Sequence, residues 1–406
     1  MPSSKTLAGR WCRLLLIALV AASSPAAASD GLPIAEAESV GMSTERLSRI
    51  GGWLDTIVEN GQAAGVVTLV ARHGKVVQFT ATGTRGMGVS DPMRPEALFD
   101  IASMTKPLTA VAALMLYEEG RITLDDLVSI HIPEFKNPMI LQESGDIMPA
   151  EGEMSVRHLF THTSGVRDPR GRAETYAFPT MDAYMADFAK LPLRAEPGSK
   201  WIYGDSLDVL GYLVERVSGQ GLDEFLQDRV LDPLGMTDTH YWPPEAKQGR
   251  RAMLVVNGND DPTRVSREPV EAGESKTFIS GASGLHTTAA DYWRFCQMLL
   301  NGGEFGGNRL LGPRTVSLIS MNHLEEGTPY RPGLGFGLGF AVVSDPAKAR
   351  LPYSVGSYYW GGSQGTVFWI DPAEHLVGVL MVQVRPAGRL QLRQKFAALV
   401  YAAIID

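Results

Sequence analysis

The order of strand-like and helix-like segments most limits how this chain can fold. Runs rich in β-branched and aromatic residues lie near the start, at residues 65–83, and again near the end, at residues 335–384. Helical patterns fill most of the sequence between them, and amphipathic helices at 44–58 and 390–404 flank the strand-rich regions. This order predicts an α+β fold in which both ends of the chain share one sheet and a mostly helical lobe is inserted between them.

The first 28 residues are typical of a secretory signal peptide. The basic residues Lys5, Arg10 and Arg13 precede an apolar run, LLLIALVAA, and small residues follow at 26–29. The run is too short to span a membrane. We therefore expect residues 1–28 to direct export to the periplasm or the medium, with an uncleaved anchor as the alternative.

The remaining residues, 29–406, are expected to form one domain. Its α/β part should comprise about 30–100 and 280–406, and its helical lobe about 101–279. The chain carries a net charge of −8 and no cluster of basic residues, which argues against nucleic acid as a partner. We expect a small ester or amide as substrate, with no cofactor and no metal, and the sequence leaves the oligomeric state open.

Ser103 and Lys106 form the first candidate pair of catalytic residues. They belong to ASMTKP, at the entrance of a helical segment that is otherwise apolar. Residues three apart share a helix face, so a partly desolvated lysine can take the proton of the serine, which then acts as a nucleophile. Because Ser-x-x-Lys is common by chance, a capping serine with a lysine that reaches solvent is the alternative.

Two later segments offer the other parts of such a site. KWIYGDS places Tyr203 on a loop before a helix, where it could relay protons, although an ordinary half-buried tyrosine is also possible. In YYWGGSQGTVFW, Gly361 and Gly362 precede Ser363 between two strands. Glycines allow a backbone N–H to approach a ligand closely, but a plain hairpin turn would carry the same residues.

The order SMTK, then Tyr203, then Trp-Gly-Gly resembles the serine β-lactamase and penicillin-binding-protein family, in its class C and family VIII carboxylesterase branch. LFTHTSGV, DPLGMTDT and SGASGLHTTAADYWRF resemble connecting segments of that family. The resemblance implies a β-lactamase/transpeptidase-like fold with an antiparallel sheet flanked by helices and the site in the cleft beside the helical lobe. It further implies that Ser103 is the nucleophile, Lys106 and Tyr203 its proton acceptors, and the N–H groups of Ser103 and Ser363 the oxyanion hole.

Two departures from the β-lactamase pattern bear on the substrate. The third motif is Trp360-Gly361-Gly362, where β-lactamases carry Lys-Thr-Gly, so the cation that would meet a substrate carboxylate is missing. Asp205 stands where β-lactamases have asparagine, and a carboxylate near Lys106 would favour the charged lysine.

These departures favour a carboxylesterase for short or medium acyl esters that acts through an acyl-enzyme on Ser103. A β-lactamase or D-alanyl-D-alanine carboxypeptidase is the alternative, and Arg385 could then supply a cationic anchor. A further alternative is a non-catalytic homologue that binds peptidoglycan.

Other motif matches are expected to be coincidental. Gly204–Leu207 matches the GDSL pattern of another esterase class but lacks its partner blocks, and Gly361–Gly365 matches Gly-x-Ser-x-Gly without a following helix. His158 and His162 lie four residues apart with no obvious third metal ligand, so we expect a structural role for both. His286 is also expected to be structural.

Overall fold

The computed structural model describes residues 31–170, 172–175, 177–256, 265–267 and 278–406. The proposed signal peptide therefore lies outside the described residues. Leu32–Asp406 forms one compact unit, and its main sheet is antiparallel throughout. In spatial order the sheet consists of β11 (Leu334–Phe336), β12 (Ala341–Val343), β13 (Tyr358–Gly361), β14 (Val367–Asp371), β15 (Leu376–Val382), β1 (Gly65–Arg72) and β2 (Lys75–Gly83).

The two ends of the chain meet in this sheet, as the sequence predicts. β1 and β2 form a hairpin through His73 and Gly74, and both turn residues have the positive φ angles that such a tight turn requires. The other edge of β1 pairs with β15, from Val66 opposite Val382 to Arg72 opposite Leu376. The prediction of one sheet built from both ends is confirmed.

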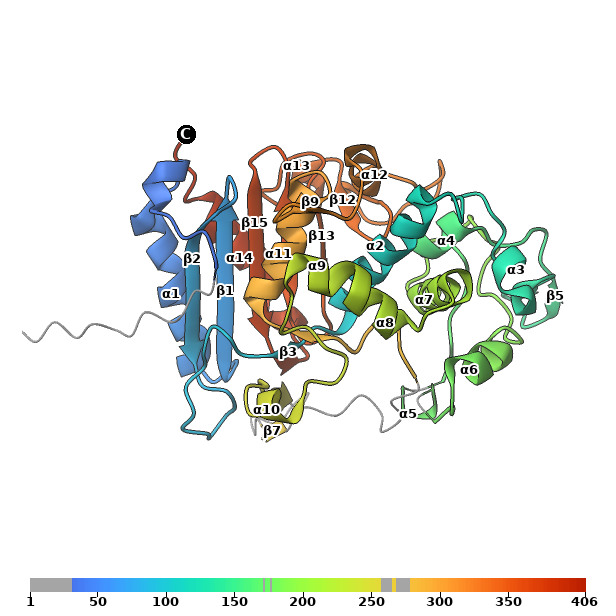
Figure 1. Cartoon of the computed structure of the whole chain (residues 1–406), viewed down its shortest axis with the longest axis horizontal. Coiled ribbons are helices and arrows are strands. Elements are labelled where there is room, and N and C mark those ends of the chain that lie inside the picture. Colours follow the sequence, from blue (N-terminus) through green and yellow to red (C-terminus); the bar gives the residue numbers. More distant parts are fainter. Residues whose placement is uncertain (1–30, 171, 176, 257–264, 268–277) are drawn as a thin grey trace, which may run out of the picture. The chain divides into compact units, whose positions relative to one another are not determined.

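Helices cover both faces of the sheet (Figure 1). Successive side chains of β14 point to opposite faces, and the ring of Phe368 lies 5.0 Å from that of Tyr292, in α11 (Ala289–Leu300). The ring of Trp369 lies 5.1 Å from that of Phe396, in α14 (Leu392–Tyr401). α11 and α14 therefore lie on opposite faces, and α1 (Thr44–Glu59) packs beside α14.

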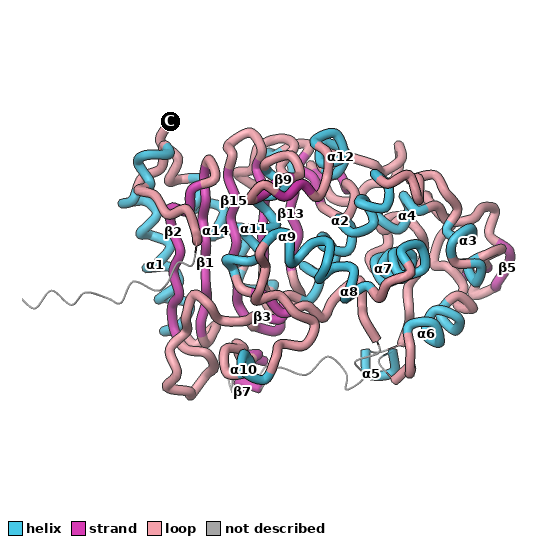
Figure 2. Tube along the Cα trace, viewed as in Figure 1, coloured by secondary structure: helices cyan, strands magenta, loops and turns pink. Residues whose placement is uncertain are grey.

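Helices and loops dominate the part of the unit away from the sheet (Figure 2). The apolar helix α2 (Thr105–Glu118), buried along most of its length, packs against α7 (Ser206–Ser218). The other helices of the described chain are α3 (Val128–His131), α4 (Val156–Phe160), α5 (Arg172–Thr175), α6 (Met181–Phe188), α8 (Leu222–Leu226), α9 (Asp232–Leu234), α10 (Glu245–Gln248), α12 (Pro313–Ile319) and α13 (Pro346–Ala349).

Short strands connect this region to the sheet-containing part. β3 (Phe99–Asp100), which leads into the segment of Ser103, pairs with β8 (His286–Thr287). β16 (Val384–Arg385), which follows β15, pairs in parallel with β6 (Leu254–Val256). The remaining short strands are β4 (Met139–Leu141), β5 (Ile147–Pro149), β7 (Val265–Arg267), β9 (Glu304–Phe305) and β10 (Asn308–Arg309).

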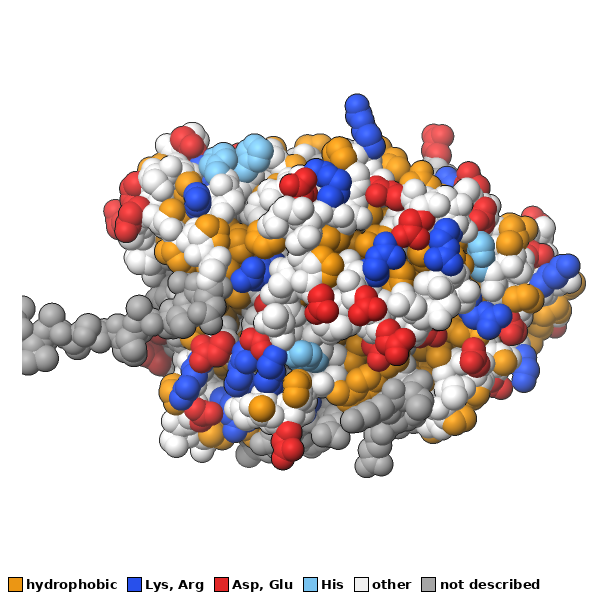
Figure 3. Space-filling model, viewed as in Figure 1, with side chains coloured by type: hydrophobic (Ala, Val, Ile, Leu, Met, Phe, Trp, Pro, Cys, Tyr) orange, Lys and Arg blue, Asp and Glu red, His pale blue; other side chains and the backbone are white. Residues whose placement is uncertain are grey.

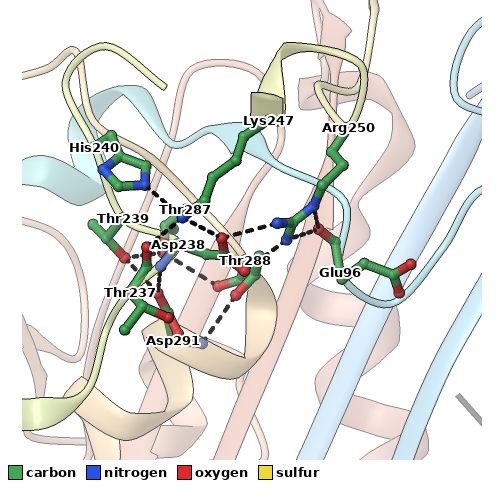
Figure 4. Close-up of polar contacts among 10 residues, drawn as sticks. All are labelled: Glu96, Thr237, Asp238, Thr239, His240, Lys247, Arg250, Thr287, Thr288 and Asp291. Atoms are coloured by element: carbon green, nitrogen blue, oxygen red, sulfur yellow. Dashed lines mark hydrogen bonds and ion pairs between the residues drawn. The ribbon is translucent and has the colours of Figure 1, made fainter. Parts of the chain in front are cut away.

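A polar network fixes the segment before β3 (Figure 4). The carboxylate of Asp238 makes ion pairs with Lys247 at 2.9 Å and with Arg250 at 2.6 Å. Arg250 also donates to the backbone carbonyl of Glu96, while the backbone N–H of Asp238 donates to Asp291, in the first turn of α11. The network thus ties the chain that leads to Ser103 to a helix packed on the sheet.

The surface charges and the helices of the described chain complete the description of the fold. On the face drawn in Figure 3, basic side chains lie among acidic ones. Among the described residues, no helix combines the length and the apolar composition that crossing a membrane requires.

Candidate active site

Ser103 lies in a short 3₁₀ turn, Ala102–Met104, that connects β3 to α2. The sequence predicted that Ser103 opens the helix itself, whereas α2 begins two residues later, at Thr105. Ala102 has a φ of 42°, in the left-handed region, so the chain turns sharply just before the serine. Lys106 lies in the first turn of α2, one turn beyond Ser103 as predicted.

Lys106 is held against the serine by the surrounding fold. Its side chain is 4% exposed, and its Nζ lies 3.3 Å from the Oγ of Ser103. The same Nζ donates to the backbone carbonyl of Ala282 at 3.0 Å. A buried amine with so few partners is costly unless its chemistry is used, which distinguishes Lys106 from a lysine that reaches solvent.

Tyr203 is the second residue that contacts the serine oxygen. Its hydroxyl donates to the Oγ of Ser103 at 2.7 Å. The Nζ of Lys106 lies 4.9 Å from the centre of the Tyr203 ring. The serine oxygen therefore faces two groups that can exchange protons with it, and the structure brings together all three residues that sequence reasoning selected.

An aromatic cluster supports Tyr203 and includes Trp360. The Trp360 ring lies 5.6 Å from that of Tyr203 and 5.4 Å from that of Phe336, and the side chain is 9% exposed. The ring of His162 lies 4.8 Å from Tyr203 and stacks on Trp360 at 6.5 Å. Burial, followed by the charge of Lys106, holds the pKa of His162 well below its ordinary value, so this imidazole is neutral.

Ser363 lies beside the nucleophile at the end of β13. It lines the same hollow as Ser103, Lys106 and Tyr203, which has a volume of about 360 Å³. Its hydroxyl accepts a hydrogen bond from the guanidinium of Arg385 at 3.0 Å. Gly361 and Gly362 precede it and line a neighbouring hollow of about 340 Å³.

Asp205 lines the catalytic hollow but is held by the backbone. Its carboxylate accepts from the N–H of Asp168 at 2.8 Å. Burial, and then the charge of Asp208, raise the pKa of Asp205 to about 6. The site therefore contains a carboxyl group that keeps its proton to a higher pH than an exposed aspartate does.

Sequence reasoning missed Asp208, which positions the acceptor of Lys106. Its carboxylate accepts from the hydroxyl of Ser280 at 2.5 Å and from the N–H of Ala282 at 3.2 Å. The carbonyl of Ala282 is the group that holds Lys106. The position of Asp208, five residues after Tyr203, gave only a weak signal, because the segment of Ala282 is far away in sequence.

The other motif matches lie in structural positions. Ser206 of the GDSL match is buried in α7, and its hydroxyl is hydrogen-bonded to that of Ser164. The segment Gly361–Gly365 forms a turn between β13 and β14, with no helix after it. His158 accepts from the N–H of Ser155 as part of a capping box. His286 is buried beside Arg251, and burial lowers its pKa to about 4.

Neither a cluster of metal ligands nor a larger hollow gives a better candidate site in the described part of the chain. Within the described ranges, no group of three or more His, Cys, Asp or Glu side chains is placed to hold a metal ion. A hollow of about 470 Å³ lies at Glu224, His240 and Trp242, and it is larger than the one at Ser103. We place the site at Ser103 because a serine hydroxyl, a buried amine and a phenol converge there.

Comparisons with known proteins agree with this geometry. The chain matches the family model "Beta-lactamase" over residues 52–402, and it belongs to that family. Esterase EstB of Burkholderia gladioli is 30% identical over 370 residues, covering 84% of this chain and 91% of the relative. A relative from Escherichia coli O157:H7, named provisionally as a D-alanyl-D-alanine carboxypeptidase, is 28% identical over 415 residues, with coverages of 94% and 92%.

A solved structure supports both the fold and the class of enzyme. EstCE1, described as a hydrolase with promiscuous acyltransferase activity, superposes with a TM-score of 0.74 at 26% identity, over 88% of this chain and 99% of that one. The fold is thus β-lactamase/transpeptidase-like, as predicted, and the protein is a serine hydrolase of that family.

Proposed function

We propose that this protein is an exported carboxylesterase that cleaves short or medium acyl esters through an acyl-enzyme on Ser103. The observation that carries the proposal is the convergence of Lys106 and Tyr203 on the Oγ of Ser103, at 3.3 Å and 2.7 Å. Both distances are within the range over which a proton is transferred directly or after a slight approach. The proposed export rests on the sequence of residues 1–28.

In the proposed reaction, Ser103 passes its proton to the Lys106–Tyr203 pair as its Oγ attacks the ester carbonyl carbon. The N–H groups of Ser103 and Ser363 stabilise the oxyanion of the tetrahedral intermediate. The C–O bond to the alcohol then breaks, and the alcohol leaves with the proton held by the pair. In the second half-reaction a water molecule attacks the acyl carbon and gives a proton to the same pair. The bond between the acyl carbon and the Oγ then breaks, Ser103 takes the proton back from the pair, and the carboxylic acid leaves.

The neutral third motif supports an ester rather than a charged substrate. In the third motif, Trp360 stands where the β-lactamase motif has lysine, and its indole packs among aromatic rings, so this position offers no cation to bind a carboxylate. EstB, whose name gives it as an esterase, is 30% identical to this chain. Together these observations favour neutral acyl esters.

A β-lactamase or D-alanyl-D-alanine carboxypeptidase is the second candidate, and three arginines favour it. Arg385 donates to Ser363 at 3.0 Å, while Arg331 and Arg393 line the neighbouring hollow that also includes Ser363. Among the ion pairs of the described chain, none involves these three side chains. They could bind a substrate carboxylate although Trp360 cannot.

A side-by-side rate comparison on a p-nitrophenyl acyl ester and a chromogenic cephalosporin tests the two candidates. The esterase proposal expects specificity for the acyl ester, and the alternative expects the reverse order. Labelling by a fluorophosphonate, followed by intact mass, separates either enzyme from a protein that only binds peptidoglycan. A single adduct on the wild type and none on Ser103→Ala is the expected result, and an unlabelled wild type would contradict it.

A further inference from the structure

One half-buried carboxylate, that of Asp100, connects the two segments that carry the proposed oxyanion donors. Asp100 ends β3, and its Oδ1 accepts from the backbone N–H of Ala102 at 2.8 Å. Its Oδ2 accepts from the side-chain amide of Gln364 at 2.7 Å. Ala102 directly precedes Ser103, and Gln364 directly follows Ser363, so each bond lies one residue from a proposed donor.

The two segments are also packed closely around this carboxylate. A Cβ built on Gly362 would lie 2.6 Å from the carbonyl oxygen of Ile101, a distance that real Cβ atoms do not tolerate from a backbone atom. The backbone carbonyl of Asp100 accepts from the side chain of Gln383 at 2.8 Å. The carbonyl of Gln364 accepts from the N–H of Val384 at 2.9 Å. The turn between β13 and β14, which carries Ser363, thus rests on the turn that carries Ser103.

The burial of Gln364 strengthens its hydrogen bond to Asp100. Gln364 is 4% exposed, so water has little access to its amide, and its Oε1 makes no hydrogen bond within the described chain. A hydrogen bond between a carboxylate and a desolvated donor is stronger and more directional than one between neutral groups in water. This bond therefore restrains the spacing of the two segments more firmly than a surface contact would.

We propose that Asp100 and Gln364 are positioning residues that set the separation of the Ser103 and Ser363 N–H groups. This inference rests on the proposed function, since it concerns the oxyanion hole of that reaction. An oxyanion hole works only when its donors lie within about 2.7–3.1 Å of the developing charge, so a small displacement weakens the transition state. The substrate carbonyl carries little charge before attack, and its binding should change less.

The first test is Gln364→Leu, with Gln78→Leu as a matched control. Gln78 lies in β2 of the main sheet and donates its side-chain amide to the hydroxyls of Thr68 and Thr80. Like Gln364, it has a buried Oε1 without a hydrogen-bond partner in the described chain. On a p-nitrophenyl acyl ester, Gln364→Leu should lower kcat roughly tenfold to a hundredfold with KM within about twofold. Gln78→Leu should leave both constants within about twofold.

The second test reverses the pair. Gln364→Glu places two carboxylates in contact and should lower kcat at least as much as Gln364→Leu. Adding Asp100→Asn restores the interaction, because the asparagine Oδ1 still accepts from Ala102 while its amide donates to the new glutamate. The double variant should recover most of the lost kcat. The rescue compares the kcat of the double variant with that of Gln364→Glu. It therefore tests the proposed positioning role even if Gln364→Leu fails to fold.

The rate of Ser103 labelling by a fluorophosphonate gives a readout that does not need ester turnover. The labelling rate should follow kcat across the variants: lowered in Gln364→Leu and Gln364→Glu, and largely recovered in the double variant. The reason is that phosphonylation also builds negative charge on an oxygen in the oxyanion hole. A kcat of Gln364→Leu equal to that of Gln78→Leu, or a double variant no better than Gln364→Glu, would overturn the inference while leaving the esterase intact. A wild type that neither labels nor hydrolyses the ester would instead overturn the proposed function, and this inference with it.

Discussion

The hydroxyl of Tyr203 lies 2.7 Å from the Oγ of Ser103, although the two residues are 100 positions apart in the chain. Ser103 precedes α2 and Tyr203 precedes α7, and these two helices pack against each other. The contact between the helices therefore brings their N-terminal ends, and with them the two hydroxyl groups, to one point. Each of the following predictions changes one group at that point or in its surroundings.

Ser103→Ala should abolish ester turnover and fluorophosphonate labelling while the fold persists. The change deletes one hydroxyl at the surface of a hollow, so the free energy of unfolding should fall by at most about 1 kcal/mol. Ser283→Ala, which removes a hydroxyl from the same hollow, is the matched control and should retain turnover. Preserved turnover in Ser103→Ala together with a large loss of thermal midpoint would make Ser103 a structural residue.

Tyr203→Phe should lower kcat by roughly a hundredfold to ten-thousandfold, the range usual for losing a general acid–base group. The phenyl ring keeps its contacts with His162 and Trp360, so the thermal midpoint should stay nearly constant. Steady-state kinetics on a p-nitrophenyl ester, with circular dichroism melting in parallel, measures both. If kcat stayed within about twofold of wild type, Lys106 alone would serve as the proton acceptor.

Trp360→Lys should shift preference from neutral esters toward matched esters that carry a carboxylate. A partly desolvated cation facing a carboxylate contributes on the order of 1–3 kcal/mol, or roughly tenfold to a hundredfold in the ratio of kcat/KM values. Trp360→Phe is the control, because it removes the indole without adding charge. Trp360 is 9% exposed, so a variant that loses stability and both activities with an unchanged ratio would show that the indole only supports the cluster.

Asp205→Asn should stabilise the protein more at pH 8 than at pH 4. Burial raises the pKa of Asp205 to about 6, so the folded state binds its proton more tightly than the unfolded chain does. The stability that this carboxyl contributes is present below about pH 4 and is lost as the pH rises through about 6. The variant should therefore gain on the order of 1–3 kcal/mol relative to wild type across that window.

Asp291→Asn is the matched control for this pH dependence. Burial also raises the pKa of Asp291 to about 6, but its carboxylate lies in the network at the start of α11 (Figure 4) and does not line the hollow of Ser103. Both variants should change the pH dependence of stability, measured by urea unfolding at several pH values. Only Asp205→Asn should move the acidic limb of kcat/KM to lower pH, since it removes a negative charge from the site. If the acidic limb of kcat/KM lay at the same pH in both variants, Asp205 would not influence the reacting groups.

Local patterns were enough to predict the sheet and the helices that cover it. The stripe of Leu47, Ile50 and Leu54 indicates a helix with one buried face, and α1 buries all three residues. The β-branched runs around His73 and Gly74 indicate the hairpin of β1 and β2. Both signals arise within a few residues, so neither depends on the rest of the fold.

The groups that support the catalytic residues could not be predicted in this way. Asp208 holds the loop of Ala282, whose carbonyl accepts from Lys106, and Asp100 meets Gln364 across 264 positions of sequence. Such pairs have no spacing rule, because chain topology rather than local periodicity brings them together. For the same reason, the sequence placed Ser103 on the helix, whereas the turn at Ala102 shifts it into the segment before α2.

The pairing of β1 with β15 has a consequence for when this enzyme can first act during its synthesis. During synthesis, Ser103, Lys106 and Tyr203 leave the ribosome long before Ser363 does. The second edge of β1 can pair only after residues 376–382 have been made. Contacts of such long sequence separation form late and slow folding. The nucleophile is therefore translated early but should stay inert until the chain is nearly complete. A truncation before β13 would leave a serine with its proton acceptors and no second oxyanion donor.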